Sequence, residues 1–460
     1  MKLDFENTYK SIYFIGIGGV SMSGLAEILL QKGLTVSGSD MKKSASTQRL
    51  EKLGVKVNYG HNYENIKDNI DLVVYTAAVK EDNPEIVSAK DKNITVVERA
   101  VLLGSIMDDY SRSIAVAGTH GKTTTTSMIS EILLAADADP TITIGGTLST
   151  INGNIKVGSS EYFVAEACEY HDSFLKFDPF VAVILNIEAE HLDYFKDINQ
   201  IRTSFKGFAE NASPSGYVII NSADPALDYI TKDLKSSVVT FGTDKEKSMW
   251  YPENIIHDED GTNEFDAYFE GRFMGHISLN VPGDHNILNA LAACAASTAV
   301  GIKMSSITKG LGHFTGTNRR FQYKGTYNGV TIIDDYAHHP TEVKATLAAA
   351  QHVKHNTIWC IFQPHTYTRA KTLLKEFGQS FKDADRVIVA DIYAAREKDT
   401  GLIHSREVAE EINRNSKNAQ YIGDLNAIVE FIKNEAKEGD LLITMGAGDV
   451  YTVGEKLINM

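Results

Sequence analysis

Short apolar runs recur along this chain, and each is followed by a glycine-rich or polar loop and then by a helix-like stretch. The first run, Ser11 to Ile15, leads through Gly16-Ile17-Gly18-Gly19 into a helical pattern over Met22 to Gln31 and a second apolar run, Leu34 to Ser37. Apolar runs that alternate with helical segments are typical of strands in a parallel sheet. The pattern therefore predicts an α/β fold with mostly parallel sheets.

The same alternation continues to the end of the chain. Predicted strands in the last third are Val330 to Ile333, Thr357 to Phe362, Arg386 to Ala390 and Asp440 to Thr444, and all four would hand polar or glycine-rich loops to one edge of a sheet. At 460 residues the chain is long enough for about three domains. We expect them to occupy residues 1–110, 111–320 and 321–460.

The most informative loop follows the predicted strand Ser113 to Ala117 and consists of Gly118-Thr119-His120-Gly121-Lys122-Thr123-Thr124, with a helix predicted from Thr125 to Ala135. Backbone N-H groups and a helix N-terminus at such a turn favour bound phosphate. Lys122 would reach the β- and γ-phosphates of ATP, and Thr123 could hold Mg²⁺. Val116 stands where the full P-loop pattern has its first glycine, so a turn without a ligand stays open as an alternative.

Acidic and imidazole groups follow two further predicted strands. Tyr162 to Ala165 ends at Glu166, and Val181 to Leu185 ends at the segment Asn186-Ile187-Glu188-Ala189-Glu190-His191-Leu192-Asp193. Because ligands bind beyond the carboxyl ends of parallel strands, Glu166, Glu188 and His191 could converge over the loop and hold a metal ion on phosphate. The alternative is structural: Glu166 would cap a strand and His191 a helix.

Two later segments carry groups suited to a nucleotide. His285, Asn286 and Asn289 open an alanine-rich helix and could face a purine edge, although an N-cap before a core helix is equally open. Arg319 and Arg320 would be solvated unless a phosphate or carboxylate lies near them.

The strand-end loops of the last third contain histidines and an arginine. His338 and His339 are adjacent, so their side chains diverge, and no further ligand follows at metal spacing, which makes a metal site the weaker interpretation. Orienting or carboxylate-binding roles fit better, because an arginine such as Arg369 can hold a carboxylate with two hydrogen bonds.

The first domain opens like a nucleotide-binding βαβ unit that is closed by Asp40. Its glycines would let the backbone approach a pyrophosphate, and an acidic residue after the second strand can bind ribose. Ser21 replaces the third glycine of the dinucleotide pattern, so we expect a nucleotide-like ligand, with NAD and a purely structural turn as alternatives.

Composition excludes several classes of protein. Lysine and arginine number 45 against 60 acidic residues, a net charge of -15, so the basic footprint of a nucleic-acid-binding protein is missing. We find neither a signal-peptide pattern nor an apolar run long enough for a membrane span, and therefore expect a soluble, cytoplasmic protein without a membrane partner. Cys168, Cys294 and Cys360 are too few and too dispersed for a disulfide scaffold.

These loops, taken in order, resemble those of the Mur ligase family. The resemblance rests on Gly16 to Gly19, Gly118 to Thr123, Asn186 to Asp193, Gly283 to Asn286, Asp334 to Glu342 and Phe362 to His365, and it covers nearly the whole chain. It implies three domains: a Rossmann-like N-terminal domain, a central P-loop ATPase-like domain with a mostly parallel sheet, and a C-terminal Rossmann-like domain. ATP would lie between the second and third domains, so a closure motion would complete the site.

The activity that the resemblance implies is ATP-dependent amide synthesis. The muramyl carboxylate of UDP-N-acetylmuramate would be phosphorylated by ATP to an acyl phosphate, and L-alanine would displace the phosphate, with Mg²⁺ and Lys122 neutralising charge on the phosphates.

The resemblance also implies roles for individual residues. Mg²⁺ ligands would be Thr123, Glu166 and His191. ATP contacts would be Gly118, Thr119, His120, Gly121, Lys122, Thr123, Thr124, His285, Asn289, Arg319, Arg320 and Asp335. Alanine and the reacting carboxylate would be met by Tyr336, His338, His365 and Arg369, and the UDP group by Gly18, Gly19, Asp40 and His61. Lys122, His191, His338 and Arg369 would be the catalytic residues.

Other functions stay open at this point. A recycling ligase that attaches a preformed tripeptide to the same nucleotide sugar would share the ATP machinery, and a regulatory protein without turnover or an NAD-dependent dehydrogenase are more distant alternatives. We expect a monomer or a weak homodimer. Lys206 stands where sister ligases place a carbamylated lysine, and an unmodified surface lysine is the alternative.

Overall fold

The computed structural model describes residues 3–5, 7–76, 79–192, 194–258, 262–395 and 397–460. Asp193, the last residue of the predicted metal-binding segment, lies outside the described residues. The chain forms two compact units, the first made of Met1–Tyr251, Tyr268–Gly275 and Asn289–Gly310, the second of Pro252–Ala267, His276–Leu288 and Leu311–Met460. Each unit is described by itself.

The first unit begins with a five-stranded parallel sheet in the order β3-β2-β1-β4-β5. Its elements are β1 Ser11–Ile15, α1 Val20–Gln31, β2 Thr35–Asp40, α2 Ala45–Lys52, β3 Lys56–Tyr59, η1 Tyr63–Asn65, β4 Leu72–Tyr75, α3 Pro84–Asp91, β5 Thr95–Glu98 and α4 Arg99–Met107.

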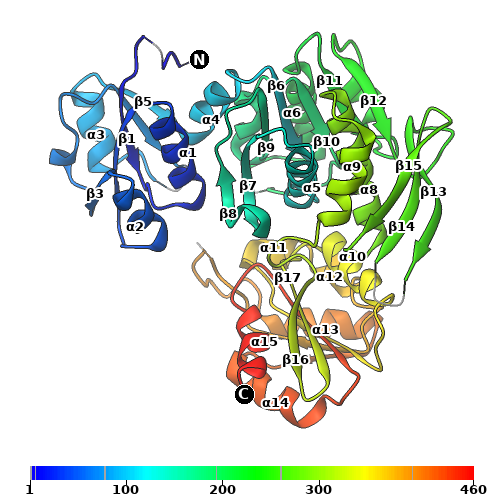
Figure 1. The fold of residues 1–460 in the computed structure, drawn as a ribbon. Helices are drawn as coiled ribbons and strands as arrows, with labels where there is room; N and C mark the ends of the chain where they lie inside the picture. Colours follow the sequence, from blue (N-terminus) through cyan, green and yellow to red (C-terminus); the bar gives the residue numbers. More distant parts are fainter. Residues whose placement is uncertain (1–2, 6, 77–78, 193, 259–261, 396) are drawn as a thin grey trace. The chain divides into compact units, whose positions relative to one another are not determined.

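Alternate residues of the central strand β1 face opposite sides of this sheet. Phe14 packs with Leu25 of α1 in one cluster, whereas Tyr13 packs with Ile86 of α3 in another. Helices α1 and α3 therefore cover opposite faces, as Figure 1 shows. Strand β2 is longer than predicted: it continues to Asp40, because β3 pairs alongside it as far as Tyr59.

A second sheet of ten strands follows, in the order β15-β14-β13-β12-β11-β10-β6-β9-β7-β8. Its strands are β6 Arg112–Ala117, β7 Thr141–Leu148, β8 Gly153–Lys156, β9 Tyr162–Glu166, β10 Val181–Ile184, β11 Tyr217–Asn221, β12 Ser237–Phe241, β13 Trp250–His257, β14 Asn263–Phe269 and β15 Arg272–Leu279. Its helices are α5 Lys122–Ala135, η2 Ser149–Ile151, η3 Tyr170–Lys176, α6 Ile198–Glu210, α7 Leu227–Thr231, α8 Asp284–Ala299 and α9 Met304–His313.

The part of this sheet that surrounds β6 is parallel. Strand β6 pairs with β9 and β10, and β7, β11 and β12 extend it in the same direction, whereas β8 pairs antiparallel with β7. The carboxyl ends of β6, β9 and β10 consequently lie at one edge, where the loops with the candidate residues begin. Helix α5 packs against β6, β7 and β9.

The second unit contains a six-stranded sheet in the order β16-β17-β21-β18-β19-β20. Its elements are β16 Gln322–Tyr327, β17 Val330–Asp335, α10 Pro340–Ala350, β18 Ile358–Phe362, α11 Tyr367–Thr372, α12 Leu374–Gly378, β19 Arg386–Val389, α13 Ser405–Asn415, β20 Ala419–Tyr421, α14 Leu425–Glu435, β21 Leu441–Met445 and α15 Tyr451–Ile458.

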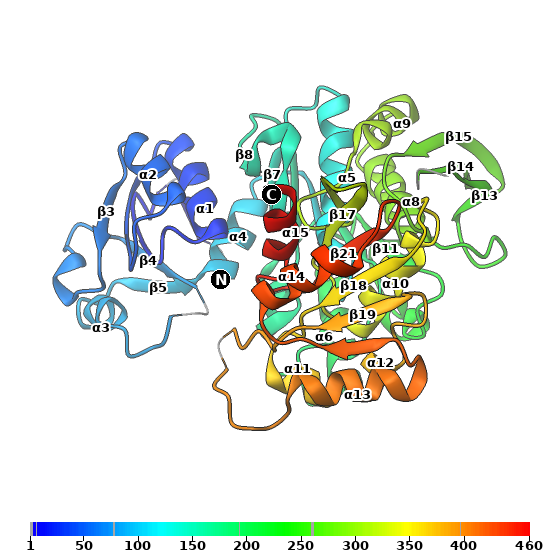
Figure 2. The same cartoon turned by 90° about the horizontal axis from the view of Figure 1, so that it is seen from below.

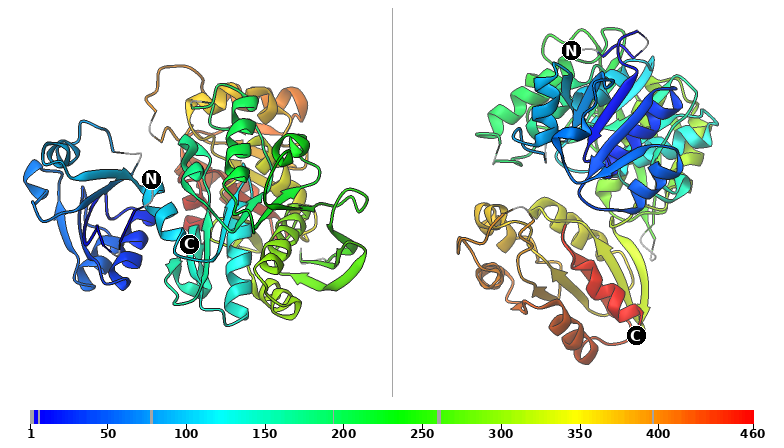
Figure 3. Two further views of the ribbon diagram at one scale, coloured as in Figure 1. Left: turned by 90° about the horizontal axis from the view of Figure 1, so that it is seen from above. Right: turned by 90° about the vertical axis from the view of Figure 1, so that its left-hand side faces the viewer.

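Strands β17, β21, β18 and β19 of this sheet are parallel, which confirms the prediction that their loops share one edge. Two separate apolar clusters lie on its faces, one with α10, α12 and α13 and the other with α14 and α15. Figure 2 shows α13 and α14 on opposite sides of the strands, and Figure 3 gives a second view of the same sheet.

Strand β17 continues past its predicted end at Ile333. Asp334 and Asp335 remain in the strand because they pair with Thr444 and Met445 of β21, and both aspartates are buried. Their side chains therefore belong to the sheet edge rather than to a free loop.

Among the described residues, no helix is both long enough and apolar enough to cross a membrane. Cys168, Cys294 and Cys360 are all free, as the sequence predicted.

Candidate nucleotide and substrate sites

The predicted phosphate loop connects β6 to α5. Gly118 and Gly121 have φ angles of 140° and 85°, a region that favours glycine. A Cβ atom at Gly121 would lie 2.6 Å from Asn289 Oδ1, and one at Gly118 would lie 2.9 Å from Leu185 Cβ. Both glycines are required for conformation and for packing. Because Gly121 caps the helix, α5 begins at Lys122 rather than at the predicted Thr125.

Asn186, at the end of β10, fixes the shape of this loop. Its Oδ1 accepts from the His120 N-H at 2.8 Å, its Nδ2 donates to the His120 carbonyl at 3.1 Å, and its own carbonyl accepts from the Thr119 N-H at 3.0 Å. No role was predicted for Asn186, although it stands in the sequence motif that begins after β10. An amide side chain at the end of the strand beside the loop was the available signal.

The amine of Lys122 points back to the loop and to Glu169. Its Nζ donates to the carbonyls of Gly118 and Thr119, the latter at 3.1 Å, and lies 3.0 and 3.2 Å from the two carboxylate oxygens of Glu169. Burial disfavours the charged amine, but the Glu169 carboxylate leads the effects that outweigh it, so the pKa of Lys122 is raised. Burial also raises the pKa of the Cys168 thiol, which disfavours a thiolate at this position.

His191 lies in a loop and not at a helix end. It has a φ of 56°, and helix α6 begins seven positions later, capped by Asp197. The ring of His191 lies 4.6 Å from that of Tyr170, and its Nε2 lies 3.9 Å from Glu169 Oε1. The alternative that His191 caps a helix is therefore wrong. Glu169, which the sequence analysis did not select as a ligand-facing residue, links Lys122 to His191.

Thr123 and Glu166 lie against neighbouring residues of β7. The Gly145 N-H donates to Glu166 Oε1 at 2.5 Å, and a Cβ atom at Gly146 would lie 2.9 Å from Thr123 Cγ2. A hydroxyl and a carboxylate beside a glycine pair offer hard oxygen donors, which suit Mg²⁺. The oxygen donors of this region thus fit the predicted cation. Glu166 in addition binds the backbone of β7.

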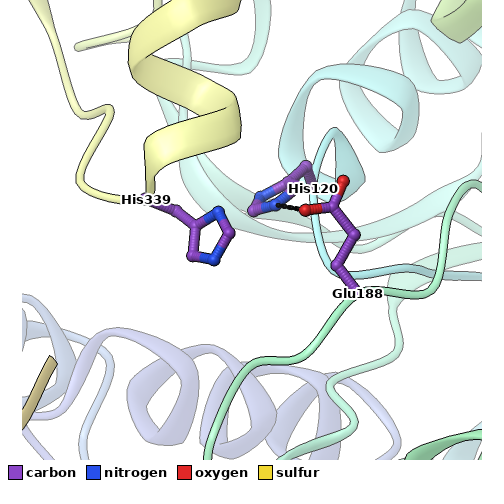
Figure 4. Close-up of side chains that lie close together, drawn as sticks. All are labelled: His120, Glu188 and His339. Atoms are coloured by element: carbon purple, nitrogen blue, oxygen red, sulfur yellow. Dashed lines mark ion pairs between the residues drawn. The ribbon is translucent and has the colours of Figure 1, made fainter. Parts of the chain in front are cut away.

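A second imidazole and carboxylate flank the loop. His120 Nε2 lies 3.5 Å from Glu188 Oε2, as the dashed line in Figure 4 marks. The N-H of Glu188 also donates to Thr119 Oγ1 at 2.9 Å. His339, labelled in the same figure, belongs to the second unit.

The predicted UDP-binding residues form two linked groups at the end of the first sheet. The Gly18 N-H donates to Asp40 Oδ2 at 2.9 Å, and a Cβ atom at Gly18 would approach that oxygen to 2.8 Å. His61 Nδ1 lies 3.0 Å from Ser39 Oγ, next to Asp40, and 2.8 Å from Glu85 Oε2. Gly19 is the N-cap of α1.

Glu85 is a buried carboxylate that the sequence analysis overlooked. It accepts hydrogen bonds from Tyr13, Ser39 and Asn65 in addition to its contact with His61. Its position in the first turn of α3, after the Asn83 cap, made it resemble an ordinary helix-start residue.

Arg319 is bound within the second unit. Its guanidinium donates to Asp334 Oδ2 at 2.9 Å, to the Gly446 carbonyl at 2.6 Å and to the Gly448 carbonyl at 3.1 Å. Arg320 makes a weaker ion pair, 3.9 Å from Glu342 Oε1, and is 31% exposed. The two adjacent arginines are thus in different environments. Arg319 connects β17 to the loop after β21, whereas Arg320 is partly exposed and lies near Glu342 and the Tyr336 ring.

The Asp335 carboxylate is occupied by the backbone. Its two oxygens accept from the N-H groups of Ala337 and Phe321 at 2.7 and 2.8 Å. Burial raises its pKa to about 6, against the opposing effect of Arg320.

The residues predicted to surround alanine lie in one continuous row. The Tyr336 and His338 rings are 5.4 Å apart, the His338 and His365 rings 5.7 Å, and Arg369 Nη1 lies 2.9 Å from His365 Nδ1. Three of the four come from loops after β17 and β18, and Arg369 is in α11. Tyr393, which the sequence analysis did not select, stacks on His365 at 5.8 Å.

Glu342 organises the histidine pair at the start of α10. Its Oε2 accepts from the N-H groups of His338 and His339 at 3.0 and 3.2 Å. His339 Nδ1 accepts from the Thr341 N-H, so His339 is the cap of this helix. Glu342 was quoted in the sequence motif, but no role was predicted for it.

His285 lies in the first turn of α8, and its side chain is exposed. Asn286 donates to the Pro282 carbonyl at 2.7 Å, and Asn289 packs beside Gly121. The residues predicted to contact a purine therefore lie in different surroundings. The Asn286 amide is bound to the backbone of the preceding loop, and Asn289 lies next to the phosphate loop.

The parallel sheets and the glycine loop between strand and helix define a multidomain α/β protein with a phosphate-binding type of loop. Three family models match in order: "Mur ligase family, catalytic domain" over residues 11–111, "Mur ligase middle domain" over 116–297 and "Mur ligase, glutamate ligase domain" over 319–448. The chain belongs to the Mur ligase family.

Individual relatives resemble the chain over its full length. A protein of Acetivibrio thermocellus, described as UDP-N-acetylmuramate–L-alanine ligase, is 55% identical over 98% of this chain and 96% of its own. The crystal structure of UDP-N-acetylmuramate-alanine ligase from Thermotoga maritima is similar with a TM-score of 0.79, 28% identity and 98% of both chains covered. A murein peptide ligase from Psychrobacter arcticus covers the same shares with a TM-score of 0.69 and 26% identity. The predicted three-domain α/β fold is confirmed.

Proposed function

We propose that this protein joins L-alanine to the muramyl carboxylate of UDP-N-acetylmuramate with ATP as the energy source, giving UDP-N-acetylmuramoyl-L-alanine, ADP and phosphate for peptidoglycan synthesis. The observation that carries the proposal is the 55% identity, over nearly the full length of both chains, to a relative described as this ligase. The proposal assigns UDP-sugar binding to residues 1–110, ATP binding to 111–320 and amino-acid binding to 321–460. The ends of the three family-model matches support these boundaries.

The phosphate loop, Gly118 to Thr124, is the proposed cradle for the ATP phosphates, with Lys122 as the group that neutralises them. The left-handed glycines and the Asn186 clamp support this, because they leave a fixed turn at a helix N-terminus. Thr123, Glu166 and His191 would hold Mg²⁺, which when bound supplies positive charge to the phosphate oxygens. Further proposed ATP contacts are His285, Asn289, Arg319, Arg320 and Asp335.

Of the two arginines, Arg320 is the better candidate for a phosphate contact. Arg319 already donates to three acceptors, and moving it would leave the buried Asp334 carboxylate without its cation. Asp335 accepts one backbone N-H on each carboxylate oxygen, and each oxygen keeps a second lone pair for a ribose hydroxyl. We therefore assign Arg319 mainly to positioning the site and keep Asp335 as a proposed ribose contact.

His338 is the proposed acceptor of the proton from the alanine ammonium group. Its Nδ1 lies 3.0 Å from the Tyr336 carbonyl oxygen and 3.3 Å from Glu342 Oε2. Both neighbours accept hydrogen bonds, so the ring proton resides on Nδ1 and the lone pair on Nε2. A neutral amine is the nucleophile that displaces phosphate from an acyl phosphate.

Arg369 is the proposed holder of the alanine carboxylate. Its Nη1 donates to His365 Nδ1, so one edge of the guanidinium is fixed while the planar fork can hold a carboxylate with two bonds. Tyr336 and His365 would complete the pocket, and Gly18, Gly19, Asp40 and His61 would meet the UDP group.

Lys206 makes contacts that favour an unmodified amine. Its Nζ lies 5.0 Å over the Tyr229 ring and 4.0 Å from Glu210 Oε1, and both contacts need a positive charge.

The test is phosphate release from the purified protein with Mg-ATP and UDP-N-acetylmuramate, with L-alanine, with L-alanyl-γ-D-glutamyl-diamino acid tripeptide, and with neither. We expect release that depends on both the nucleotide sugar and L-alanine, with the amide product detected by mass spectrometry. Release with the tripeptide alone would assign the protein to the recycling ligases. We also propose a monomer or weak homodimer, which analytical ultracentrifugation would check.

A further inference from the structure

All three protons of the Lys122 ammonium group are already directed to protein oxygens, so none is available to a phosphate. An ammonium group has three donors, and Lys122 Nζ contacts four oxygens: the carbonyls of Gly118 and Thr119 and both carboxylate oxygens of Glu169. Only 17% of its side chain is exposed. A phosphate can therefore be contacted only when one of these bonds is given up.

Glu169 is the partner that a phosphate would displace. The two carbonyls belong to the loop itself, whose shape is held by Asn186, so they cannot move away independently. The Glu169 carboxylate is a side-chain group that is negatively charged, as a phosphate is, and it lies 3.0 Å from the amine. An incoming phosphate would compete with it directly for Lys122.

When Lys122 turns from Glu169 to a phosphate, Glu169 stays buried and no longer has a full positive charge beside it. Its side chain is 3% exposed, and a buried carboxylate without a cation is strongly unfavourable. Another group near it is His191, whose Nε2 is 3.9 Å from Oε1. His191 is also a proposed ligand of the divalent cation. A cation arriving there with the nucleotide would supply the charge that Lys122 takes away.

We propose that Glu169 couples nucleotide binding to divalent-cation binding. Without nucleotide, Glu169 is the counter-ion of Lys122. When a nucleotide without Mg²⁺ takes Lys122 away, Glu169 is left as a buried, unpaired carboxylate, so this nucleotide binds poorly. The inference rests on the proposed function, since it places the ATP phosphates at Lys122. It assigns Glu169 a positioning role that differs from direct contact with the reacting atoms.

The test compares the dissociation constant of ADP for the full-length protein in EDTA and in Mg²⁺, measured by calorimetry. For the wild type we expect Mg²⁺ to tighten binding. In Glu169→Gln, ADP should bind about tenfold more tightly in EDTA, because a repelling charge is removed, and the effect of Mg²⁺ should shrink by a similar factor. Glu161→Gln is the matched control, since Glu161 also pairs with a cation, Arg112, but on the surface.

A second variant separates the effect from a folding defect. In Lys122→Ala the Glu169 carboxylate has lost its cation, so nucleotide-free protein should bind Mn²⁺ about tenfold more tightly than the wild type, as followed by electron paramagnetic resonance. Lys122→Ala with Glu169→Gln should lose this gain.

The outcomes separate the coupling through Glu169 from the proposed function. If the wild type binds ADP and Glu169→Gln shows the wild-type dependence on Mg²⁺, the coupling is overturned while the ATP site stands. If the folded wild type binds no ADP in either condition, both the proposed function and the coupling fail. The coupling is established if Glu169→Gln, but not Glu161→Gln, binds ADP more tightly without Mg²⁺, and if Lys122→Ala binds Mn²⁺ more tightly than the wild type.

Discussion

Glu85, in the first turn of α3, holds His61 in place: His61 Nδ1 lies 2.8 Å from Glu85 Oε2, and the Glu85 side chain is entirely buried. Three further donors, from Tyr13, Ser39 and Asn65, surround the same carboxylate. The position of His61, a proposed contact of the UDP group, is thus set by a residue that is itself inaccessible to solvent.

Replacing Glu85 by glutamine should weaken both the fold and UDP-sugar binding. The new amide would present N-H groups to neighbours that are donors, and a buried unsatisfied donor costs about 1–3 kcal/mol. We expect a loss of that size in urea unfolding, and a weaker dissociation constant for UDP-N-acetylmuramate by calorimetry. Glu81→Gln, at a site 85% exposed, should change neither. Wild-type values for Glu85→Gln would mean that the buried carboxylate is not needed.

The two adjacent arginines should separate stability from activity. Arg319→Ala leaves the Asp334 carboxylate buried without its cation, which should cost about 3–5 kcal/mol and lower the melting temperature measured by calorimetry. Arg320→Ala removes a long, partly exposed ion pair with Glu342 and a contact 5.4 Å over the Tyr336 ring, so its stability should change by about 1 kcal/mol at most. Its phosphate release should nevertheless fall, with a higher KM for ATP. The reverse assignment would show as a stable but inactive Arg319 variant.

The buried Asp335 should make the protein more stable in mild acid than near neutral pH. Burial raises its pKa to about 6 in the folded state, above the ordinary 3.8, so the folded chain binds more protons between these values. Stability from this group is therefore complete below pH 3.8 and is lost as the pH rises through 6, by roughly 3 kcal/mol in all.

Comparing Asp335→Asn with the wild type isolates this carboxyl group, because an asparagine side chain does not titrate. Urea unfolding at pH 5 and pH 7.5 should show a smaller loss of stability with rising pH for the variant than for the wild type. An equal loss would show that Asp335 does not titrate as described.

Replacing Arg369 by lysine should impair alanine binding selectively. A lysine keeps the charge but cannot hold a carboxylate with a planar fork, and it loses the fixed bond to His365 Nδ1. We expect the KM for L-alanine to rise about tenfold or more while the KM for ATP stays near the wild-type value, measured by phosphate release. Arg386→Lys, in which the replaced residue lies at the start of β19, serves as the control. Equal changes in both KM values would argue for a general structural defect.

The sequence predicted what is encoded locally. Strand, glycine loop and helix follow one another within a few residues, so the phosphate loop and the parallel strands were found. Element ends were less accurate, because Asp40, Asp334 and Asp335 remain in strands through pairing with residues of neighbouring strands.

Partners distant in sequence could not be predicted in the same way. Glu169 meets Lys122 across 47 positions and Glu85 meets His61 across 24, and each looks like an ordinary acidic residue on its own. Only the folded chain, in which a helix start meets a distant loop, shows that these carboxylates set the positions of the predicted site residues.

The clamp between Asn186 and the backbone of His120 has a kinetic consequence. A loop that is already hydrogen-bonded in its final shape needs no ordering when a ligand arrives, so the entropy of that ordering is lost during folding instead. Association at this loop should then follow a single exponential whose rate rises linearly with ligand concentration. Removing these hydrogen bonds, as in Asn186→Ala, should add a slow phase to the binding kinetics, because the loop must then adopt its bound conformation during association.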